Sequence, residues 1–523
     1  MIPSSKPGLV RALGALMAIA VVVGTTIGSG VFKKPQTVAE SVDYFGLVAA
    51  VWVLTGLLAF LGALTLAEVA VLYPKAGGNY VYLREGYGRL GGFLWGWVEF
   101  WIIRSASIAA LATVFAESLH DVLRNQAIQE ALRLDLGSNP LGFWQLRILT
   151  VAVIVGLALV NVRGVRWGGS LQLFITLVKI GSLLAIFLLP FVVLLVASSP
   201  ASAKAQAANL TPVWPDSLSA ISLGGLGSAF LAVLWAYHGW MNVAPVAEEV
   251  TRPQRNIPLA LLAGVGIIIA LYLGANLAYS LVIPREEMAN LKDTTTATEF
   301  SLRLLGPIGA ALASAAVMIS VFGALNGNLL VGPRLLYAMG EDGLAPRALG
   351  AVHPTFRTPV LAILVMAAWS SALILVGALL TRYRLPVIEM GSWLSIDPNV
   401  PEGKELFDIL TDFAMFGAVI FETMAVLSIF IFRRRFPDAP RPYRCWGYPL
   451  TPALYVILPA FILTNMFVRQ RTEALIGFGF IALGTALYGL VFRGAKHLPL
   501  VPGADVLAAA SPEAKPESRF QER

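Results

Sequence analysis

Cysteine, histidine and charge are all scarce in this chain of 523 residues. The single cysteine, Cys445, excludes an internal disulfide framework and any cysteine-rich metal site. Four histidines lie far apart without ligand spacing, so the sequence predicts neither a bound metal nor a cofactor. Charged residues make up 13%, about half the share of a soluble protein, and cannot cover a water-facing surface of this size. A soluble enzyme, a nucleic-acid-binding protein and a disordered scaffold are therefore excluded.

Long apolar runs are what the chain has instead. Hydrophobic residues make up 57% of it and the mean hydropathy is +0.74. A membrane helix needs about 20 apolar residues, so there is room for about twelve. The charge-free stretches predict helices near 12–36, 45–72, 90–118, 146–162, 169–197, 223–249, 257–283, 308–339, 359–380, 405–432, 450–468 and 474–492. The expected fold class is an all-α integral membrane protein whose surroundings are the lipid bilayer.

Basic residues predict the orientation of these helices. An even number of spans places both termini on one side of the membrane. With the N-terminus inside, 22 of the 38 Lys and Arg residues are cytoplasmic and 14 lie on the other side. We therefore expect a protein of the plasma or inner membrane with both termini cytoplasmic, namely residues 1–11 and a disordered tail, 493–523.

Two predicted spans are interrupted by glycine and polar residues near their middle. In the first span the run is Gly24-Thr25-Thr26-Ile27-Gly28-Ser29-Gly30, and in the sixth it is Trp235-Ala236-Tyr237-His238-Gly239-Trp240-Met241-Asn242. Irregular backbone at membrane depth is tolerated only where protein or a polar cavity meets its free N–H and C=O groups. Alternatively, Gly28 and Gly30 only allow close helix packing.

The five-helix interval between the breaks is typical of an inverted-repeat transporter with a site at mid-membrane. The repeats would be 12–197 and 223–432, followed by two further helices in 450–492. Amides that begin a half-helix attract an anion, and carbonyls that end one attract a cation. Such a site suits the carboxylate and ammonium groups of a zwitterionic amino acid.

Several stretches, taken together and in order, resemble the amino acid–polyamine–organocation (APC) superfamily, and within it the L-type amino acid transporter branch. They are Gly24 to Phe32, Tyr73 to Tyr82, Ile103 to Ser107, Tyr237 to Trp240 with Glu248-Glu249 and Pro253 to Pro258, Phe322 to Gly327, and Arg441 to Arg444. One departure is Ser105, which stands where the branch usually has a proline.

The resemblance implies a LeuT-like five-plus-five inverted repeat with two added helices, unwound in helices one and six, and exchange or uptake of amino acids. It places the substrate carboxylate at the amides of Gly28, Ser29 and Gly30. It places the ammonium at the carbonyls of Thr26, Trp235 and His238, with Ile27 and Gly239 completing the two unwound segments. It also makes Trp235 an aromatic gate over the substrate; alternatively, this tryptophan fills lipid-facing space.

Three of the ionisable residues inside predicted spans are candidates for a role. Lys179 is a functional candidate because a deeply buried lysine is costly unless it is paired. The resemblance implies that Lys179 joins helix five to the unwound part of helix one and to helix eight, with Ser320 as its polar counterpart, in place of a sodium ion. Alternatively, Lys179 snorkels to the cytoplasmic face. Arg104 and Glu99 are interpreted as a structural pair, or as residues that line the path.

His238 is the candidate for contact with the side chain of the substrate. An acidic residue there would favour cationic amino acids, whereas an imidazole does not, so the sequence predicts neutral substrates. Alternatively, the imidazole hydrogen-bonds the free backbone beside it. The mode of coupling stays open between exchange and proton-linked uptake.

Other classes remain as alternatives. A major facilitator would carry a basic motif after helix two, which Tyr73 to Arg89 lacks, and an enzyme would need clustered acid–base or metal-binding groups. A proton-coupled amino acid or polyamine symporter, or an amino-acid sensor without transport, remains open. The segment from His120 to Trp144 has no cysteine, so no disulfide-linked heavy subunit is expected.

Overall fold

The computed structural model describes residues 8–195, 206–291, 294–383, 388–389, 395–396, 406–469, 471–492 and 500–503. The predicted disordered tail, 493–523, lies outside these residues except for 500–503, and so do the first seven residues of the predicted N-terminal segment.

The described chain is almost entirely helical. Its first-half helices are α1 Ala15–Thr26, α2 Gly30–Ser41, α3 Phe45–Leu72, α4 Asn79–Tyr87, α5 Arg89–Val98, a π-helix Glu99–Arg104, α6 Ser105–Arg124, α7 Gln126–Leu132, α8 Phe143–Val162 and α9 Val165–Leu195. The later helices are α10 Leu223–Tyr237, α11 Pro253–Val282, α12 Arg285–Ala289, α13 Thr296–Val331, α14 Pro333–Glu341, α15 Val360–Arg382, α16 Leu406–Arg435, α17 Leu450–Tyr455, α18 Ile457–Arg469 and α19 Arg471–Val491. Short 3₁₀ turns are Ala207–Leu210, Leu218–Ala220, Ala247–Glu249 and Arg347–Gly350.

A pair of two-residue strands departs from the purely helical expectation. The strands β1 Ile388–Glu389 and β2 Ser395–Ile396 are antiparallel, with Ile388 opposite Ile396. They lie between α15 and α16, where the sequence predicts a connection between spans.

Eleven helical segments of the described residues are long and apolar enough to cross a membrane, which makes this a multi-pass membrane protein. The remaining expected span, the sixth at 223–249, is α-helical only over Leu223–Tyr237. After Tyr237 the chain turns through Gly239 at φ 106°, a backbone conformation that favours glycine and ends the α-helix.

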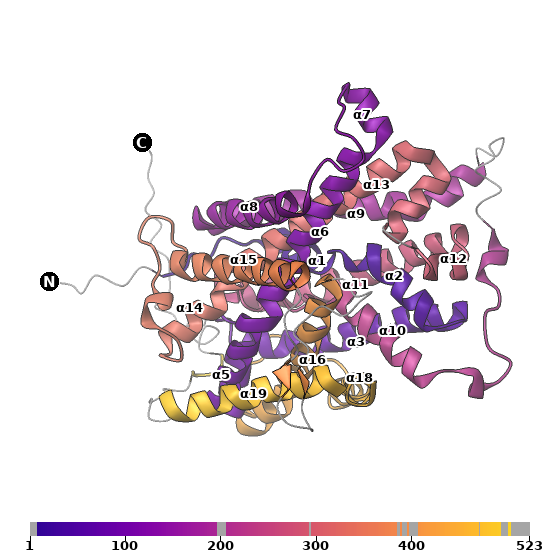
Figure 1. Ribbon diagram of the computed structural model, residues 1–523. Helices are drawn as coiled ribbons and strands as arrows, with labels where there is room; N and C mark the ends of the chain where they lie inside the picture. Colours follow the sequence, from indigo (N-terminus) through magenta and orange to yellow (C-terminus); the bar gives the residue numbers. More distant parts are fainter. Residues whose placement is uncertain are drawn as a thin grey trace, which may run out of the picture.

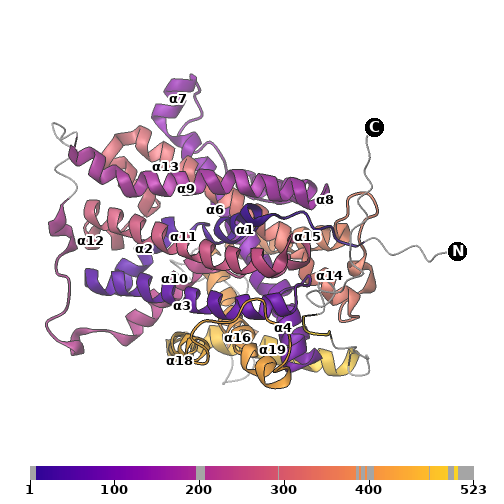
Figure 2. The ribbon, with the colours of Figure 1, turned by 180° about the vertical axis from the view of Figure 1, so that it is seen from behind.

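The first predicted span lies at the centre of the bundle. In the most apolar 18-residue stretch of this span 78% is buried, whereas the corresponding share for α19 at the periphery is 17%. Helix α1 packs against α9, α11 and α13, while α10 packs against α2 and α3. Figure 1 shows α1 and α2 in the middle of the molecule and α18 and α19 along one edge, and Figure 2 shows α3, α11 and α9 side by side on the opposite face.

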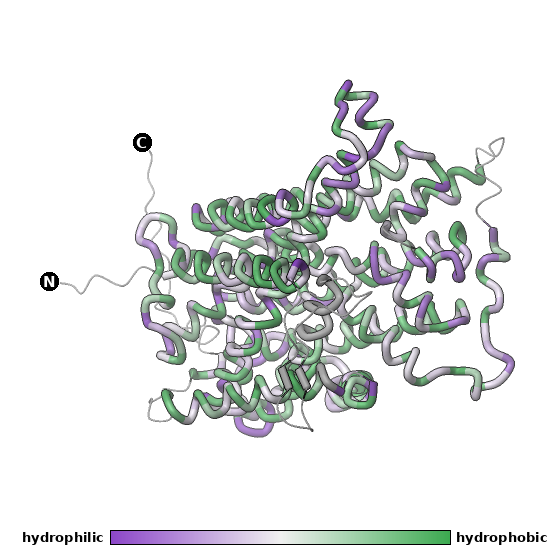
Figure 3. Tube along the Cα trace, in the orientation of Figure 1, coloured by the Kyte–Doolittle hydropathy of each residue, from purple (hydrophilic) through white to green (hydrophobic). Residues whose placement is uncertain are grey.

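Apolar side chains cover the outer helices. Figure 3 shows long hydrophobic stretches on α8 and α15, with hydrophilic residues concentrated on α7 and near helix ends. On α9 the exposed side chains include Phe174, Leu177, Leu184 and Leu188. In water such a surface would be unfavourable, so these helices face lipid.

Segments near both ends of the described chain contact the same end of the bundle. The loops that follow α3 and α10 meet there. The hydrogen bonds are Leu13 N–H to Glu249 O at 2.9 Å, Gly503 N–H to Leu72 O at 2.9 Å and Ala76 N–H to Glu248 Oε2 at 3.0 Å.

Candidate functional site

The helical backbone is interrupted between α1 and α2. Helix α1 ends at Thr26 and α2 begins at Gly30, so Ile27, Gly28 and Ser29 lie outside both helices. The Ser29 hydroxyl is buried and has no hydrogen-bond partner among the described residues. The hydroxyl therefore keeps its hydrogen-bonding capacity for a ligand or a water molecule at this turn.

Lys179 and Ser320 bind the carbonyls freed where α1 ends. Lys179 on α9 is 1% exposed, and its ammonium donates to Gly24 O and Ile27 O, both at 2.6 Å. Ser320 on α13 donates to Ile27 O at 3.2 Å or to Gly28 O at 3.3 Å. The Lys179 side chain thus points into the bundle rather than snorkelling to a membrane face.

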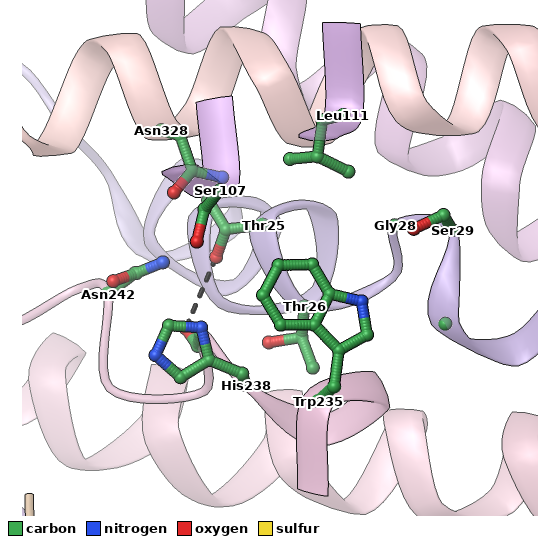
Figure 4. A pocket seen from close by; sticks show the side chains of 12 residues that line it. Thr25, Thr26, Gly28, Ser29, Ser107, Leu111, Trp235, His238, Asn242 and Asn328 are labelled. Carbon is green, nitrogen blue, oxygen red and sulfur yellow. Dashed lines mark hydrogen bonds between the residues drawn. The ribbon is translucent and has the colours of Figure 1, made fainter. Parts of the chain in front are cut away.

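The end of α10 lies directly beside this interruption. Thr25 Oγ1 lies 3.2 Å from Gly239 O, the contact drawn as a dashed line in Figure 4. The hydroxyl of Tyr272 on α11 lies 3.0 Å from Thr26 O and 2.8 Å from Ala236 O, so it reaches the last turn of both helices. The interrupted segments of the first and sixth spans therefore form one site.

A small polar cavity lies between the two segments (Figure 4). Its lining residues are Thr25, Thr26, Gly28, Ser29, Gly30, Ser107, Leu111, Trp235, His238, Gly239, Asn242 and Asn328. Its volume is about 20 Å³, room for about one water molecule and less than any amino acid needs. In this conformation the cavity does not hold an amino acid.

Most residues predicted for substrate contact line this cavity, and Ile27 does not, because its side chain is fully buried in the core. Helices α6 and α13 bring Leu111 and Asn328 to the cavity, and neither residue follows from the pattern of the first or sixth span. The lining residues that sequence reasoning missed are Thr25, Ser107, Leu111, Asn242 and Asn328.

Trp235 and His238 form one wall of the cavity. Their rings are stacked, with centroids 6.1 Å apart and an angle of 11° between the planes. Trp235 is 8% exposed and lines the cavity, so it does not fill lipid-facing space. His238 Nε2 lies 3.1 Å from Glu422 Oε1 on α16. Glu422 was missed from the sequence, although a carboxylate within a span is as unusual as the lysine at position 179.

Arg104 forms a second polar cluster next to the cavity. Its guanidinium donates to Glu99 Oε1 at 2.8 and 2.5 Å, to Asn328 Oδ1 at 2.6 Å and to Asn242 Oδ1 at 3.0 Å. Arg104 and Glu99 are the two ends of the π-helix, whose wider turn lets residues five apart face each other. Arg104 and Glu99 thus form the predicted pair, and Arg104 also binds the side-chain amides of Asn242 and Asn328.

We expect Arg104→Met to destabilise the protein by about 3–5 kcal/mol, because it leaves the Glu99 carboxylate buried and unpaired. Glu99→Gln in the same chain should restore part of this loss, since it removes the unpaired charge. Thermal unfolding of the purified protein in detergent measures both effects. Arg124→Met, in an exposed pair with Asp121, is the matched control. Equal melting of the Arg104 and Arg124 variants would contradict a structural role for the cluster.

Cys445 lies outside the spans, in the loop between α16 and α17, and its side chain is buried. Its thiol is 3.7 Å from Thr65 Oγ1, and its backbone N–H donates to Glu68 Oε2 at 2.6 Å. Burial raises the pKa of the thiol, which lowers its reactivity. The only cysteine of the chain is thus poorly placed for a disulfide to another protein.

These features define a multi-pass membrane protein with a buried, polar site between interrupted helices. The chain belongs to the amino acid permease family, whose model matches residues 13–492. This confirms the resemblance to the APC superfamily. The family consists of transporters, so the protein is not an enzyme.

Curated relatives cover most of the chain. The serine/threonine exchanger SteT of Bacillus subtilis is 31% identical over 467 residues, which are 88% of this chain and 92% of the relative. The human cystine/glutamate transporter is 28% identical over 93% of this chain and 86% of its own length. The human b(0,+)-type amino acid transporter 1 is 28% identical over 94% of this chain and 90% of its own length. Amino acid transport is thus well represented among similar proteins.

Proposed function

We propose that this protein is a secondary active transporter that exchanges neutral amino acids by alternating access and without sodium. The proposed architecture is the LeuT-like inverted repeat, with repeats 12–197 and 223–432, two added helices in 450–492, and both termini cytoplasmic. The observation that carries the proposal is the cavity between two interrupted spans, whose backbone groups face each other across it.

The carboxylate of the substrate would bind at the start of α2. The amides of Gly28, Ser29 and Gly30 precede or begin this twelve-residue helix, where backbone N–H groups and the helix dipole favour an anion. The Ser29 hydroxyl, which has no partner among the described residues, adds a further donor.

The ammonium would bind the carbonyls at the ends of α1 and α10, namely Thr26, Trp235 and His238. Thr26 O already faces the Tyr272 hydroxyl, and Trp235 O accepts from the His238 N–H at 3.1 Å. A carbonyl oxygen has two lone pairs, so both retain capacity for a second donor. The two ends of a zwitterion are thus served by main-chain groups of opposite polarity.

Lys179 supports sodium independence. Its ammonium holds the carbonyls of Gly24 and Ile27, and Ser320 holds the adjacent turn from α13. A second cation among these groups would be repelled by the lysine charge. The ammonium of Lys179 therefore replaces a bound sodium ion in this proposal, and it joins α9 to the end of α1.

The small volume of the cavity supports alternating access. A volume of about 20 Å³ does not hold an amino acid, so the walls must separate to admit one. Trp235 borders the cavity from the last turn of α10, and we assign it the role of gate.

The single-cysteine chain and the buried Cys445 support a transporter that works without a disulfide-linked heavy subunit.

The charge of the cavity supports neutral substrates. Among its lining residues only His238 is ionisable, and Glu422 pairs with it.

Two observations support cytoplasmic termini. Basic residues are in excess at one face, and segments near both chain ends contact the same end of the bundle.

Counterflow in proteoliposomes tests this function. Purified protein should accumulate a labelled neutral amino acid only when unlabelled amino acid is inside, and equally with sodium or potassium outside. A pH gradient separates exchange from proton-linked uptake, since only the latter is driven by it. Binding of amino acids without any flux would identify a sensor and overturn the proposal.

A further inference from the structure

Two polar side chains of the cavity wall, those of His238 and Asn242, come from the segment after α10. Each has one polar atom that contacts the protein and one that does not. His238 Nε2 is held by Glu422 on α16 at 3.1 Å. Asn242 Oδ1 is held by Arg104 at 3.0 Å. Within the described part of the chain, His238 Nδ1 and Asn242 Nδ2 make no hydrogen bond.

Figure 4 shows where the free atoms point. One nitrogen of the His238 ring faces away from Trp235, and the other faces the space below Ser107 and beside Thr26. Since Nε2 is the atom bound to Glu422, the nitrogen facing the cavity is Nδ1. The amide nitrogen of Asn242 is turned toward the same space, and its oxygen is turned away.

The fixed contacts determine the chemistry of the free atoms. A carboxylate only accepts, so Glu422 keeps the hydrogen of a neutral His238 on Nε2 and leaves a lone pair on Nδ1. Arg104 only donates, so it fixes the oxygen of Asn242 and leaves the amide N–H groups for the cavity. The wall therefore offers one acceptor and one donor side by side.

Apart from Ser29, the other polar side chains of the wall are already hydrogen-bonded within the protein. Ser107 donates to Ile103 O at 2.7 Å. Asn328 donates to Ala324 O at 2.8 Å and accepts from Arg104 at 2.6 Å. Beyond the backbone groups and the Ser29 hydroxyl that serve the zwitterion, His238 and Asn242 therefore remain for the side chain of a substrate.

We propose that His238 and Asn242 form the side-chain subsite of the transporter, held by Glu422 and Arg104, and that it selects amino acids with a short hydroxyl or carboxamide side chain. This inference rests on the proposed function. Hydroxyl and carboxamide groups both donate and accept, so they satisfy the two free atoms together. An aliphatic side chain of the same size leaves both unpaired, which a buried polar site disfavours.

Charged side chains do not fit the same subsite. Arg104 is already paired with Glu99 at 2.5 Å, and no carboxylate lines the cavity among the described residues, so a charged side chain would find no counter-ion there. Leu111 and Trp235 close the apolar side of the cavity and limit the length of the side chain.

Isosteric substrates provide the test. Threonine and valine differ by a hydroxyl in place of a methyl group, and asparagine and leucine differ by a carboxamide in place of an isopropyl group. Exchange into proteoliposomes should favour threonine over valine, and asparagine over leucine, by about tenfold or more in kcat/KM. Equal values for the two members of each pair would overturn the inference.

The variant His238→Phe combined with Glu422→Gln keeps an aromatic ring on Trp235 and leaves no unpaired charge. We expect its threonine-to-valine ratio to fall to near one while valine exchange persists. His120→Phe makes the same exchange of side chains outside the cavity and should keep the wild-type ratio. Because each ratio is measured within one variant, a poorly folded protein lowers both rates and leaves the ratio unchanged. A wild-type ratio in the double variant would overturn the role of His238.

Glu422 acts as a positioning residue, and its conservative variant tests this. Glu422→Gln still offers an oxygen to His238 Nε2 and should keep most of the selectivity. Glu422→Leu frees the ring and should lower the threonine-to-valine ratio without a matching loss of valine exchange. Equal ratios in these two variants would overturn the positioning role. If the wild type exchanged no amino acid at all, the proposed function itself would fail, which distinguishes the two proposals.

Discussion

Lys179→Met should reduce amino acid exchange by about 100-fold or more, with little change in insertion or expression. The ammonium of Lys179 makes two charge-assisted hydrogen bonds of 2.6 Å to Gly24 O and Ile27 O. Bonds to a charged group contribute about 1.5–3 kcal/mol each, and their loss frees the turn between α1 and α2. Methionine is also unbranched and fills similar space, so the change isolates the loss of these bonds. Counterflow of a labelled neutral amino acid measures the effect.

Lys75→Met is the matched control for this variant. Lys75 is exposed in the loop between α3 and α4, where the same substitution removes a charge without freeing any backbone group at the site. It should exchange amino acids at the wild-type rate. Full exchange by the Lys179 variant would refute the role assigned to this lysine, and added sodium offers a second readout. Recovery of exchange with sodium would show that an ion can replace the missing ammonium.

Gly30→Val should abolish measurable substrate binding. A Cβ at position 30 would lie 2.5 Å from Ala236 Cα and 2.7 Å from Ala236 Cβ, closer than real contacts allow. The first turn of α2 would therefore move away from the end of α10, and the amides proposed for the carboxylate would move with it. Binding of the labelled amino acid to purified protein, by scintillation proximity, measures the loss.

Two further glycines separate this effect from general damage to the bundle. A Cβ at Gly266 on α11 would meet no atom within 4 Å, so Gly266→Val should bind normally. At Gly28 the nearest atom is Leu111 Cδ2 at 3.1 Å, the end of a flexible side chain, so Gly28→Ala should weaken binding less than Gly30→Val. Unchanged affinity in Gly30→Val, in a protein that melts like the wild type, would defeat the carboxylate assignment.

The spans were predictable because their signal is local. An apolar run of about 20 residues has few alternatives to a membrane helix, and family resemblance added the order of the motifs. The interruption at Ile27 to Ser29 was also accessible, since three glycines among hydroxyl residues weaken a helix. The sixth span was predicted too long, because the turn at Gly239 ends α10 while the sequence after it remains apolar.

The partners of the site residues were not predictable, because they come from distant helices. Tyr272 gives no signal of its own among the apolar residues of α11, yet its hydroxyl reaches two other spans. Glu422 could be recognised as an unusual carboxylate, but nothing in the sequence pairs it with His238, 184 positions earlier. The π-helix that brings Glu99 to Arg104 likewise depends on packing rather than on composition.

The position of Tyr272 has a consequence for how the ends of α1 and α10 move relative to each other. A phenol carries a single hydrogen, and here two carbonyl oxygens, of Thr26 and Ala236, compete for it. If the ammonium of a substrate binds Thr26 O as proposed, it meets a carbonyl that already shares the Tyr272 hydroxyl with Ala236 O. One side chain of α11 thus joins the carbonyl ends of α1 and α10, so a shift of either helix end changes the hydrogen bonding of the other.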